Sequence, residues 1–159
     1  MHTVCDVNLD TVQSFCAQYP GINSATSLTE VLAAPEIKGI AISTPAPSHA
    51  ALVQDALLAG KDVYVEKPLC LSEKEGEQLL ELAEKKKRIL MVGHLLWYHP
   101  VVLMLKELID QGKLGRIRYI YSNRLNMGKL RREENVLWSF APHDISVILG
   151  LTGEMTEYI

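Results

Sequence analysis

The sequence has few cysteines, little excess of charge of either sign, and no long apolar run. Its three cysteines, Cys5, Cys16 and Cys70, lack the paired spacing of metal ligands, which favours reduced thiols over a disulfide framework or a metal site. A formal net charge of -3 predicts no general attraction to nucleic acid or to an acidic membrane. No stretch approaches the length that crosses a bilayer, and the first residues lack the pattern of a signal peptide. We therefore expect a cytoplasmic protein with no metal, no nucleic-acid partner and no membrane anchor.

The composition is that of a folded chain. Hydrophobic residues make up 48% and charged residues 22% of the 159 residues, far from the signature of disorder. Short apolar runs alternate with helical patterns, which is typical of βαβ units and a parallel sheet. Ser27 and Ser72 each stand three residues before a glutamate, which predicts a capping box at the start of a helix. We expect strands over residues 3–7, 23–26, 39–44, 62–65 and 89–93, and further helices over 10–18 and 48–59.

The pattern changes after Pro100. Residues 101–110 favour a helix that ends before Gly112, and residues 116–125 favour a longer strand. A last helix is expected over residues 142–149. The change predicts that a second domain begins near this point.

A glutamate and a lysine, Glu66 and Lys67, stand at the end of the strand expected over residues 62–65. In an open α/β sheet this end is where ligands bind. A lysine held there beside a cofactor can transfer protons near neutral pH. The simpler alternative is a pair of solvated charges in a loop.

Several short motifs carry a resemblance when they are taken together and in order. The chain resembles the glucose-fructose oxidoreductase and inositol dehydrogenase (Gfo/Idh/MocA) family at Ser43-Thr44-Pro45 with His49, at Gly60-Lys61 and Glu66-Lys67-Pro68, at Gly93-His94 with Pro100, and at His143. The resemblance implies an NAD(P)-dependent oxidoreductase of sugars, cyclitols and their derivatives. It also implies a partial NAD(P)-binding Rossmann domain over residues 1–99 and the start of a C-terminal substrate and oligomerisation domain over residues 100–159. The parent enzyme is then expected to be a homo-oligomer.

The resemblance also implies roles for individual residues. Lys67 and His143 would be the catalytic groups that handle the proton of the substrate hydroxyl. Asp6, at the end of the first expected strand, would bind the adenosine ribose and favour NAD over NADP. The other residues expected to form the cofactor pocket are Thr44, Pro45, His49, Glu66 and Pro68, together with Lys67 itself.

The substrate prediction rests on thinner signals. Ser139 stands where much of the family has an aspartate. Lys67 and His143 would then carry the proton relay, as the resemblance implies for the branch that oxidises UDP-linked N-acetylhexosamine derivatives. Arginine forks suit phosphate oxygens, although the nearby Glu133 and Glu134 could pair with the basic residues instead. A UDP-sugar of surface-polysaccharide biosynthesis is therefore preferred, with a free sugar or cyclitol as the alternative. The basic cluster is Arg116, Arg118, Arg124, Lys129, Arg131 and Arg132, and the expected substrate contacts are Lys67, Arg124, Trp138, His143 and Asp144.

The sequence departs from the family most clearly in having no Gly-x-Gly-x-x-Gly and no strand before residue 3 for it to follow. The expected fold is an incomplete Rossmann-type parallel sheet followed by the start of an α/β open-sheet domain. The strand order 3-2-1-4-5-6 then leaves the central position open, between the strands over residues 3–7 and 39–44. Either these two strands close up or the domain is poorly stable. The chain is expected to be a fragment of a longer enzyme, with a non-catalytic binding remnant or an inactive fragment as alternatives.

Overall fold

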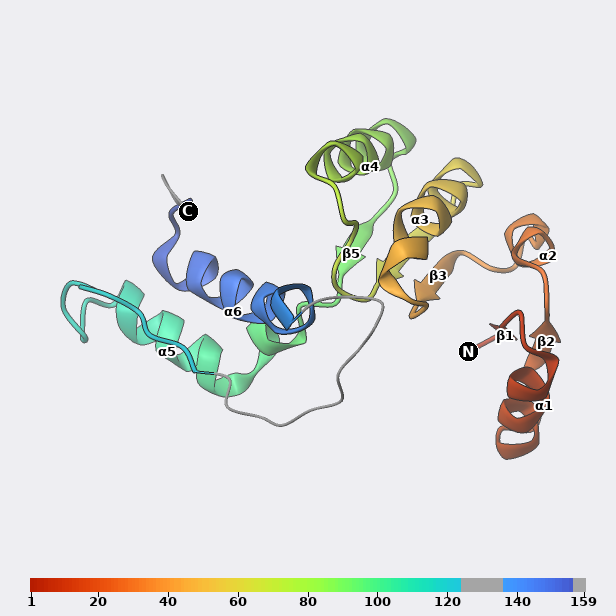
Figure 1. Cartoon of the computed structure of the whole chain (residues 1–159), viewed down its shortest axis with the longest axis horizontal. Helices are drawn as coiled ribbons and strands as arrows, with labels where there is room; N and C mark the ends of the chain where they lie inside the picture. Colours follow the sequence, from red (N-terminus) through yellow and green to blue (C-terminus); the bar gives the residue numbers. More distant parts are fainter. Residues whose placement is uncertain (124–135, 156–159) are drawn as a thin grey trace.

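The computed structural model describes residues 1–123 and 136–155 of the chain. In this part the strands are all parallel and form two separate sheets (Figure 1). The first sheet pairs β1 (Thr3–Cys5) with β2 (Asn23–Ala25). The second has the order β3-β4-β5, with β3 at Gly39–Ile42, β4 at Asp62–Val65 and β5 at Leu90–Val92.

Helices alternate with these strands, which confirms the predicted α/β class. The segments between the strands hold α1 (Leu9–Gln18), α2 (Leu28–Ala33), the short 3-10 turn η1 (Ala46–Ser48), α3 (His49–Leu58) and α4 (Glu73–Lys86). After β5 come a second 3-10 turn, η2 (Leu95–Tyr98), then α5 (Pro100–Asp110) and α6 (Val136–Thr152). None of the helices in the described ranges combines the length and apolar character that a membrane span needs.

The β1–β2 unit stands apart from the three-stranded sheet (Figure 1), and no pairing joins β1 to β3 among the described residues. The two strands therefore do not close up, and the order within each sheet, β2-β1 and β3-β4-β5, matches the predicted order on either side of the missing strand. A small apolar cluster of Ala25, Val31 and Ile37 connects the units, because Ile40 of β3 packs against it.

Helices α3 and α4 cover one face of the three-stranded sheet. Strand alternation explains the choice of face, since Val63 and Val65 of β4 are buried while Tyr64 between them is half-exposed. Val53 and Leu57 of α3 meet these valines with no exposed surface. This cluster is the main core, and it fixes β4 and the residues that follow it.

Two helix starts differ from the predicted capping boxes. Ser27 and Ser72 occupy the N-cap positions of α2 and α4 in extended conformation, but neither side chain makes a capping hydrogen bond. Two caps were not predicted: Asn8 accepts hydrogen bonds from the backbone N–H groups of Asp10 and Thr11 at the start of α1, and His99 Nδ1 accepts one from the N–H of Val101 at the start of α5.

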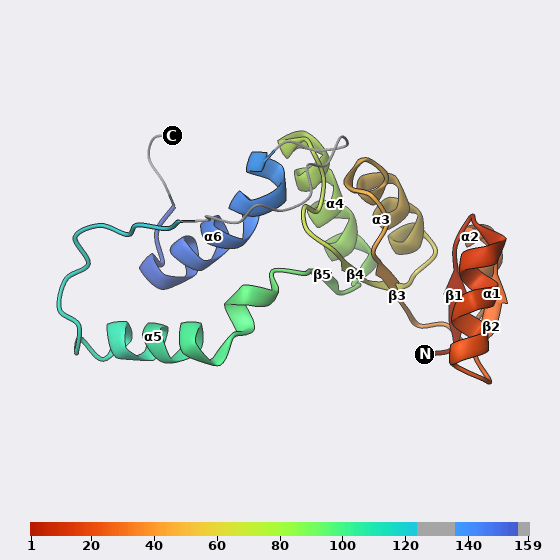
Figure 2. The same cartoon turned by 60° about the horizontal axis from the view of Figure 1, so that its bottom comes forward.

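The region after β5 corrects two expectations. Residues 116–123 form no strand, contrary to the prediction, because no neighbouring strand in the described part of the chain offers them a hydrogen-bonding edge. Helix α6 begins at Val136 rather than at residue 142, and Pro142 lies inside it. Proline inside a helix removes one hydrogen bond and its ring crowds the carbonyl four residues earlier, and α6 packs against both α5 and η2, beyond β5 (Figure 2).

Candidate active site

The carboxyl ends of the three strands of the second sheet meet at one edge. Ile42, Val65 and Val92 are direct neighbours in the strand register. The ladder continues one residue further, because the N–H of Glu66 donates to Ile42 O at 2.9 Å and the N–H of Gly93 donates to Val65 O at 2.8 Å. The segments that leave this edge carry the predicted residues Thr44 and Pro45, Glu66 to Pro68, and Gly93 with His94.

Thr44 and Pro45 form the exposed lip of this edge after β3. The hydroxyl of Ser48 lies 2.7 Å from Thr44 Oγ1 and donates to Pro45 O at 2.8 Å. The hydroxyl of Ser48 therefore fixes the turn between β3 and α3, and the side chain of Thr44 remains at the surface.

His49 lies beneath this lip and is only 1% exposed. Its ring Nε2 is 2.7 Å from Thr44 O, and its Nδ1 is 2.6 Å from Pro68 O. The side chain that the sequence places in the cofactor pocket thus has both ring nitrogens directed at backbone carbonyls.

Tyr64 and Glu66 form a pair on the half-exposed side of β4. The Tyr64 hydroxyl donates to Glu66 Oε1 at 3.3 Å. Burial and, secondarily, the Glu66 carboxylate raise the pKa of Tyr64, because both disfavour the phenolate. Gly93 makes room for the pair, since a Cβ at this position would lie 2.7 Å from the Tyr64 hydroxyl oxygen and 3.2 Å from Glu66 Oε2.

Lys67 and His94 follow β4 and β5 at this edge, and the peptide bond between Lys67 and Pro68 is cis. Burial lowers the pKa of His94, and the positive charge of Lys67 lowers it further. Nδ1 of His94 is buried and has no hydrogen-bond partner within the described ranges. Lys67 therefore lies close enough to His94 at this edge for its charge to act on the imidazole.

Helix α6 carries three more predicted site residues: Trp138, His143 and Asp144. The helix is attached to the segment that follows His94, because Gly150 lies against the indole ring of Trp97. The carbonyl of His143 accepts a hydrogen bond from the Ser146 hydroxyl at 2.8 Å. Lys67 thus follows β4, whereas His143 lies on α6, which packs against η2.

Two other predicted residues lie elsewhere. Asp6 follows β1, in the two-stranded sheet, and its Oδ1 accepts a hydrogen bond from the N–H of Asn8 at 2.8 Å. Arg124 lies outside the described residues, as do Lys129, Arg131 and Arg132 of the basic cluster.

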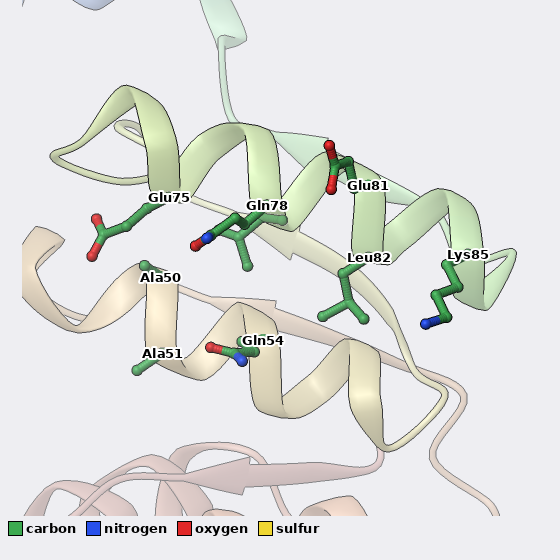
Figure 3. A pocket seen from close by; sticks show the side chains of 9 residues that line it. Ala50, Ala51, Gln54, Glu75, Gln78, Glu81, Leu82 and Lys85 are labelled. Atoms are coloured by element: carbon green, nitrogen blue, oxygen red, sulfur yellow. The ribbon is translucent and has the colours of Figure 1, made fainter.

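A groove of about 560 Å³ runs between α3 and α4 (Figure 3). Gln54 of α3 and Gln78, Glu81 and Lys85 of α4 line it, with the apolar side chain of Leu82. It lies along the helices that cover the sheet, and its mixture of charges selects no ligand of one sign.

Sequence reasoning did not assign roles to Tyr64 and His94. Strand alternation places Tyr64 on the face opposite the core and near the end of its strand. This pattern could have identified Tyr64 as a candidate site residue. Gly93-His94 marks a motif, but the burial of the His94 ring depends on contacts that the sequence pattern does not contain.

Comparison with known families gives a match over much of the chain. Residues 1–94 match the GFO_IDH_MocA family model, described as an oxidoreductase family with an NAD-binding Rossmann fold.

Individual relatives agree with this match. A UDP-N-acetylglucosamine 3-dehydrogenase of Acidithiobacillus ferrooxidans is 28% identical over 139 residues, which is 87% of this chain and 41% of the relative. An inositol 2-dehydrogenase of Burkholderia cenocepacia is 28% identical over 128 residues, which is 79% of this chain and 38% of the relative. The chain thus spans well under half of these curated relatives.

A solved structure shares the fold. The WlbA dehydrogenase of Bordetella pertussis, in complex with NADH and UDP-GlcNAcA, superposes with a TM-score of 0.68 and 24% identity, covering 73% of this chain and 33% of the other. At this level of identity the likeness concerns the fold alone.

Proposed function

Because the chain belongs to the Gfo/Idh/MocA oxidoreductase family, we propose that it takes part in NAD-dependent oxidation or reduction of a secondary alcohol on a UDP-linked sugar. One observation carries the proposal. Lys67 stands at the carboxyl end of β4, next to the half-buried imidazole of His94, at the edge where parallel α/β sheets bind their ligands.

The residues at this edge fit the nicotinamide end of a dinucleotide. The buried Nδ1 of His94, which has no protein partner in the described part of the chain, offers a polar contact. Thr44 and Pro45 provide an exposed lip on one side, and Glu66 and Pro68 flank the lysine on the other. Asp6 would hold the adenosine ribose, since Asn8 engages only its Oδ1, and this supports NAD rather than NADP. The proposal includes no pyrophosphate contact, because the sequence has no glycine-rich loop.

The chemistry requires a proton acceptor beside the reacting carbon. Nicotinamide supplies a hydride acceptor when it is bound. The alcohol that loses a hydride from carbon must also lose its hydroxyl proton, so that a carbonyl forms. We assign this proton to Lys67, with His143 of α6 as the second proton-handling or orienting group. In the reductive direction the same two groups return the proton.

The choice of a UDP-sugar rests on charge and on likeness. Arg116 and Arg118 precede the rest of the basic cluster, and guanidinium groups suit diphosphate oxygens. The 28% identical UDP-N-acetylglucosamine 3-dehydrogenase supports the same class. A cyclitol is the second candidate, because the inositol 2-dehydrogenase is equally similar. We propose residues 1–99 as the dinucleotide-binding part and residues 100–159 as the start of the substrate part, in a cytoplasmic homo-oligomer.

The test follows reduced nicotinamide by absorbance while the chain is incubated with NAD and either UDP-N-acetylglucosamine, myo-inositol or UDP alone. The proposal predicts reduction of NAD with the UDP-sugar only, and a product that mass spectrometry finds lighter by two hydrogens. Turnover of inositol alone would favour the cyclitol candidate. Saturable UDP-sugar binding without any turnover or NAD binding would identify a non-catalytic binding chain.

A further inference from the structure

His49 connects the ends of two neighbouring strands through a single side chain. The residue opens α3 and its ring is buried to 1% exposure. Nε2 lies 2.7 Å from the carbonyl oxygen of Thr44, which follows β3, and Nδ1 lies 2.6 Å from the carbonyl oxygen of Pro68, which follows β4. Both distances are short for hydrogen bonds from a ring N–H to a carbonyl.

The chemistry of the ring makes this arrangement demanding. A carbonyl oxygen can only accept, whereas a neutral imidazole carries a single N–H. Both contacts at once therefore require an N–H on each nitrogen, and a neutral ring satisfies only one carbonyl at a time. A buried acceptor that has no donor costs free energy. The ring of His49 and the two backbone segments are therefore held close to one another.

The segment that His49 holds contains the proposed catalytic lysine. Pro68 is buried and directly follows Lys67, so a fixed Pro68 carbonyl fixes the backbone from which the lysine side chain extends. Thr44, the other contact, belongs to the exposed lip on the opposite side of the same strand edge. A link of this kind sets the distance between the lip and the lysine.

We propose that His49 is a positioning residue, which places Lys67 relative to the cofactor lip through its Nδ1 contact with Pro68. This inference rests on the proposed function, and it differs from the expected role of His49 as a cofactor contact. The ring has no exposed surface to offer a ligand, and it acts through the backbone on either side.

Two substitutions separate the two contacts. The amide nitrogen of asparagine occupies the place of Nδ1 and that of glutamine the place of Nε2, so His49→Asn retains a donor to Pro68 and His49→Gln retains one to Thr44. Misplacement of a reacting group by about 1 Å can cost on the order of 10²-fold in rate. We therefore expect kcat to fall much further in His49→Gln than in His49→Asn, with a similar KM for the dinucleotide in both.

A substitution in the hydrophobic core serves as the control for a general loss of packing. Val53 is fully buried on the same helix and its side chain has no N–H to donate to either carbonyl, so Val53→Ala should lower the melting temperature without separating kcat from the folded fraction. Equal losses of kcat in the two His49 variants, or losses that follow the melting temperature through all three variants, would overturn the proposal.

A spectroscopic measurement decides the matter even if the chain shows no dehydrogenase activity. In amide proton–nitrogen spectra of the 159-residue chain, His49→Gln should shift the signals of Lys67 and Leu69, which flank Pro68. His49→Asn should instead shift those of Thr44 and Ala46. This reciprocal pattern supports the positioning role independently of turnover. The same perturbation of both segments by both variants would reject it, whereas absent turnover with the reciprocal pattern would reject only the proposed function.

Discussion

The indole ring of Trp97 lies against Gly150 of α6 and leaves no room for a side chain at this position. A Cβ at residue 150 would overlap three carbon atoms of the indole ring. This contact joins η2, which begins directly after His94, to the helix that carries His143. It therefore attaches the helix of the second proposed catalytic residue to the segment that follows His94.

Gly150→Ala should detach α6 from η2. Overpacking of a tight contact costs about 1 to 3 kcal/mol, which exceeds the gain of up to about 1 kcal/mol that alanine brings to a helix interior. We expect a lower melting temperature and faster proteolysis within α6. Gly76→Ala in α4 is the matched control, because a Cβ there meets only the Cys70 sulfur at 3.2 Å. Equal stability of the two variants would contradict the account of the Trp97 contact.

Lys61 is expected to contribute to stability in spite of its charge. It is 6% exposed and its ammonium donates to Ala34 O at 2.7 Å and to Ile37 O at 2.8 Å, between α2 and β3. Lys61→Met removes the ammonium donor from Ile37 O and leaves Ala34 O with the backbone N–H of Ile37 at 3.3 Å, and a buried carbonyl that loses its donor costs about 1 to 3 kcal/mol. Urea unfolding should show the loss. Lys86→Met provides the comparison, since the Lys86 ammonium makes only a long 3.5 Å contact at the surface, and its midpoint should not change.

Glu66→Gln should lower the pKa of Tyr64 only part of the way to its ordinary value of 10.0, because burial is the larger cause of the shift and remains. Because the pKa of Tyr64 is raised in the folded state, the contribution of this group to stability is complete below pH 10.0. It is lost as the pH rises through the pKa of the folded protein. Phenolate absorbance, with Tyr64→Phe to identify the signal, measures the pKa. An unchanged titration in Glu66→Gln would show that the carboxylate does not act on Tyr64.

Lys67→Met should raise the pKa of His94 toward its ordinary value of 6.5 without reaching it, since burial is again the larger cause. A lowered folded pKa means that the contribution of His94 to stability is present above pH 6.5 and is lost as the pH falls through the folded value. Titration of the His94 ring by NMR measures both effects. Lys85 lines the groove between α3 and α4, so Lys85→Met should leave the titration of His94 unchanged. A similar response of His94 to both substitutions would exclude a local effect of Lys67.

The sequence predicts the parallel strands and the site motifs at their carboxyl ends well, because apolar alternation and turn residues are local signals. Glu66, Lys67 and Pro68 lie after β4 as expected, for this reason. A strand was expected at residues 116–125, but residues 116–123, the described part of this range, form none. A strand requires a neighbouring strand to pair with, and the strand propensity of its own residues does not provide one.

The interactions of the site were harder to predict. His49 and Pro68 are 19 residues apart, and their contact depends on how α3 packs on the sheet. The fit of Gly150 to Trp97 joins segments more than fifty residues apart and likewise depends on tertiary packing. A pattern read along the chain identifies such residues as candidates, but it does not tell a ligand contact from a backbone support.

The most direct test of the central claim compares the chain with its Lys67→Met variant. Single-turnover hydride transfer to NAD from a UDP-sugar is measured beside the dissociation constant of NADH by fluorescence. The account predicts that removal of the proton-handling group slows transfer by about 10² to 10⁴-fold, while the NADH dissociation constant changes little. Near-normal transfer in Lys67→Met, with the dinucleotide bound equally well, would contradict the role of Lys67.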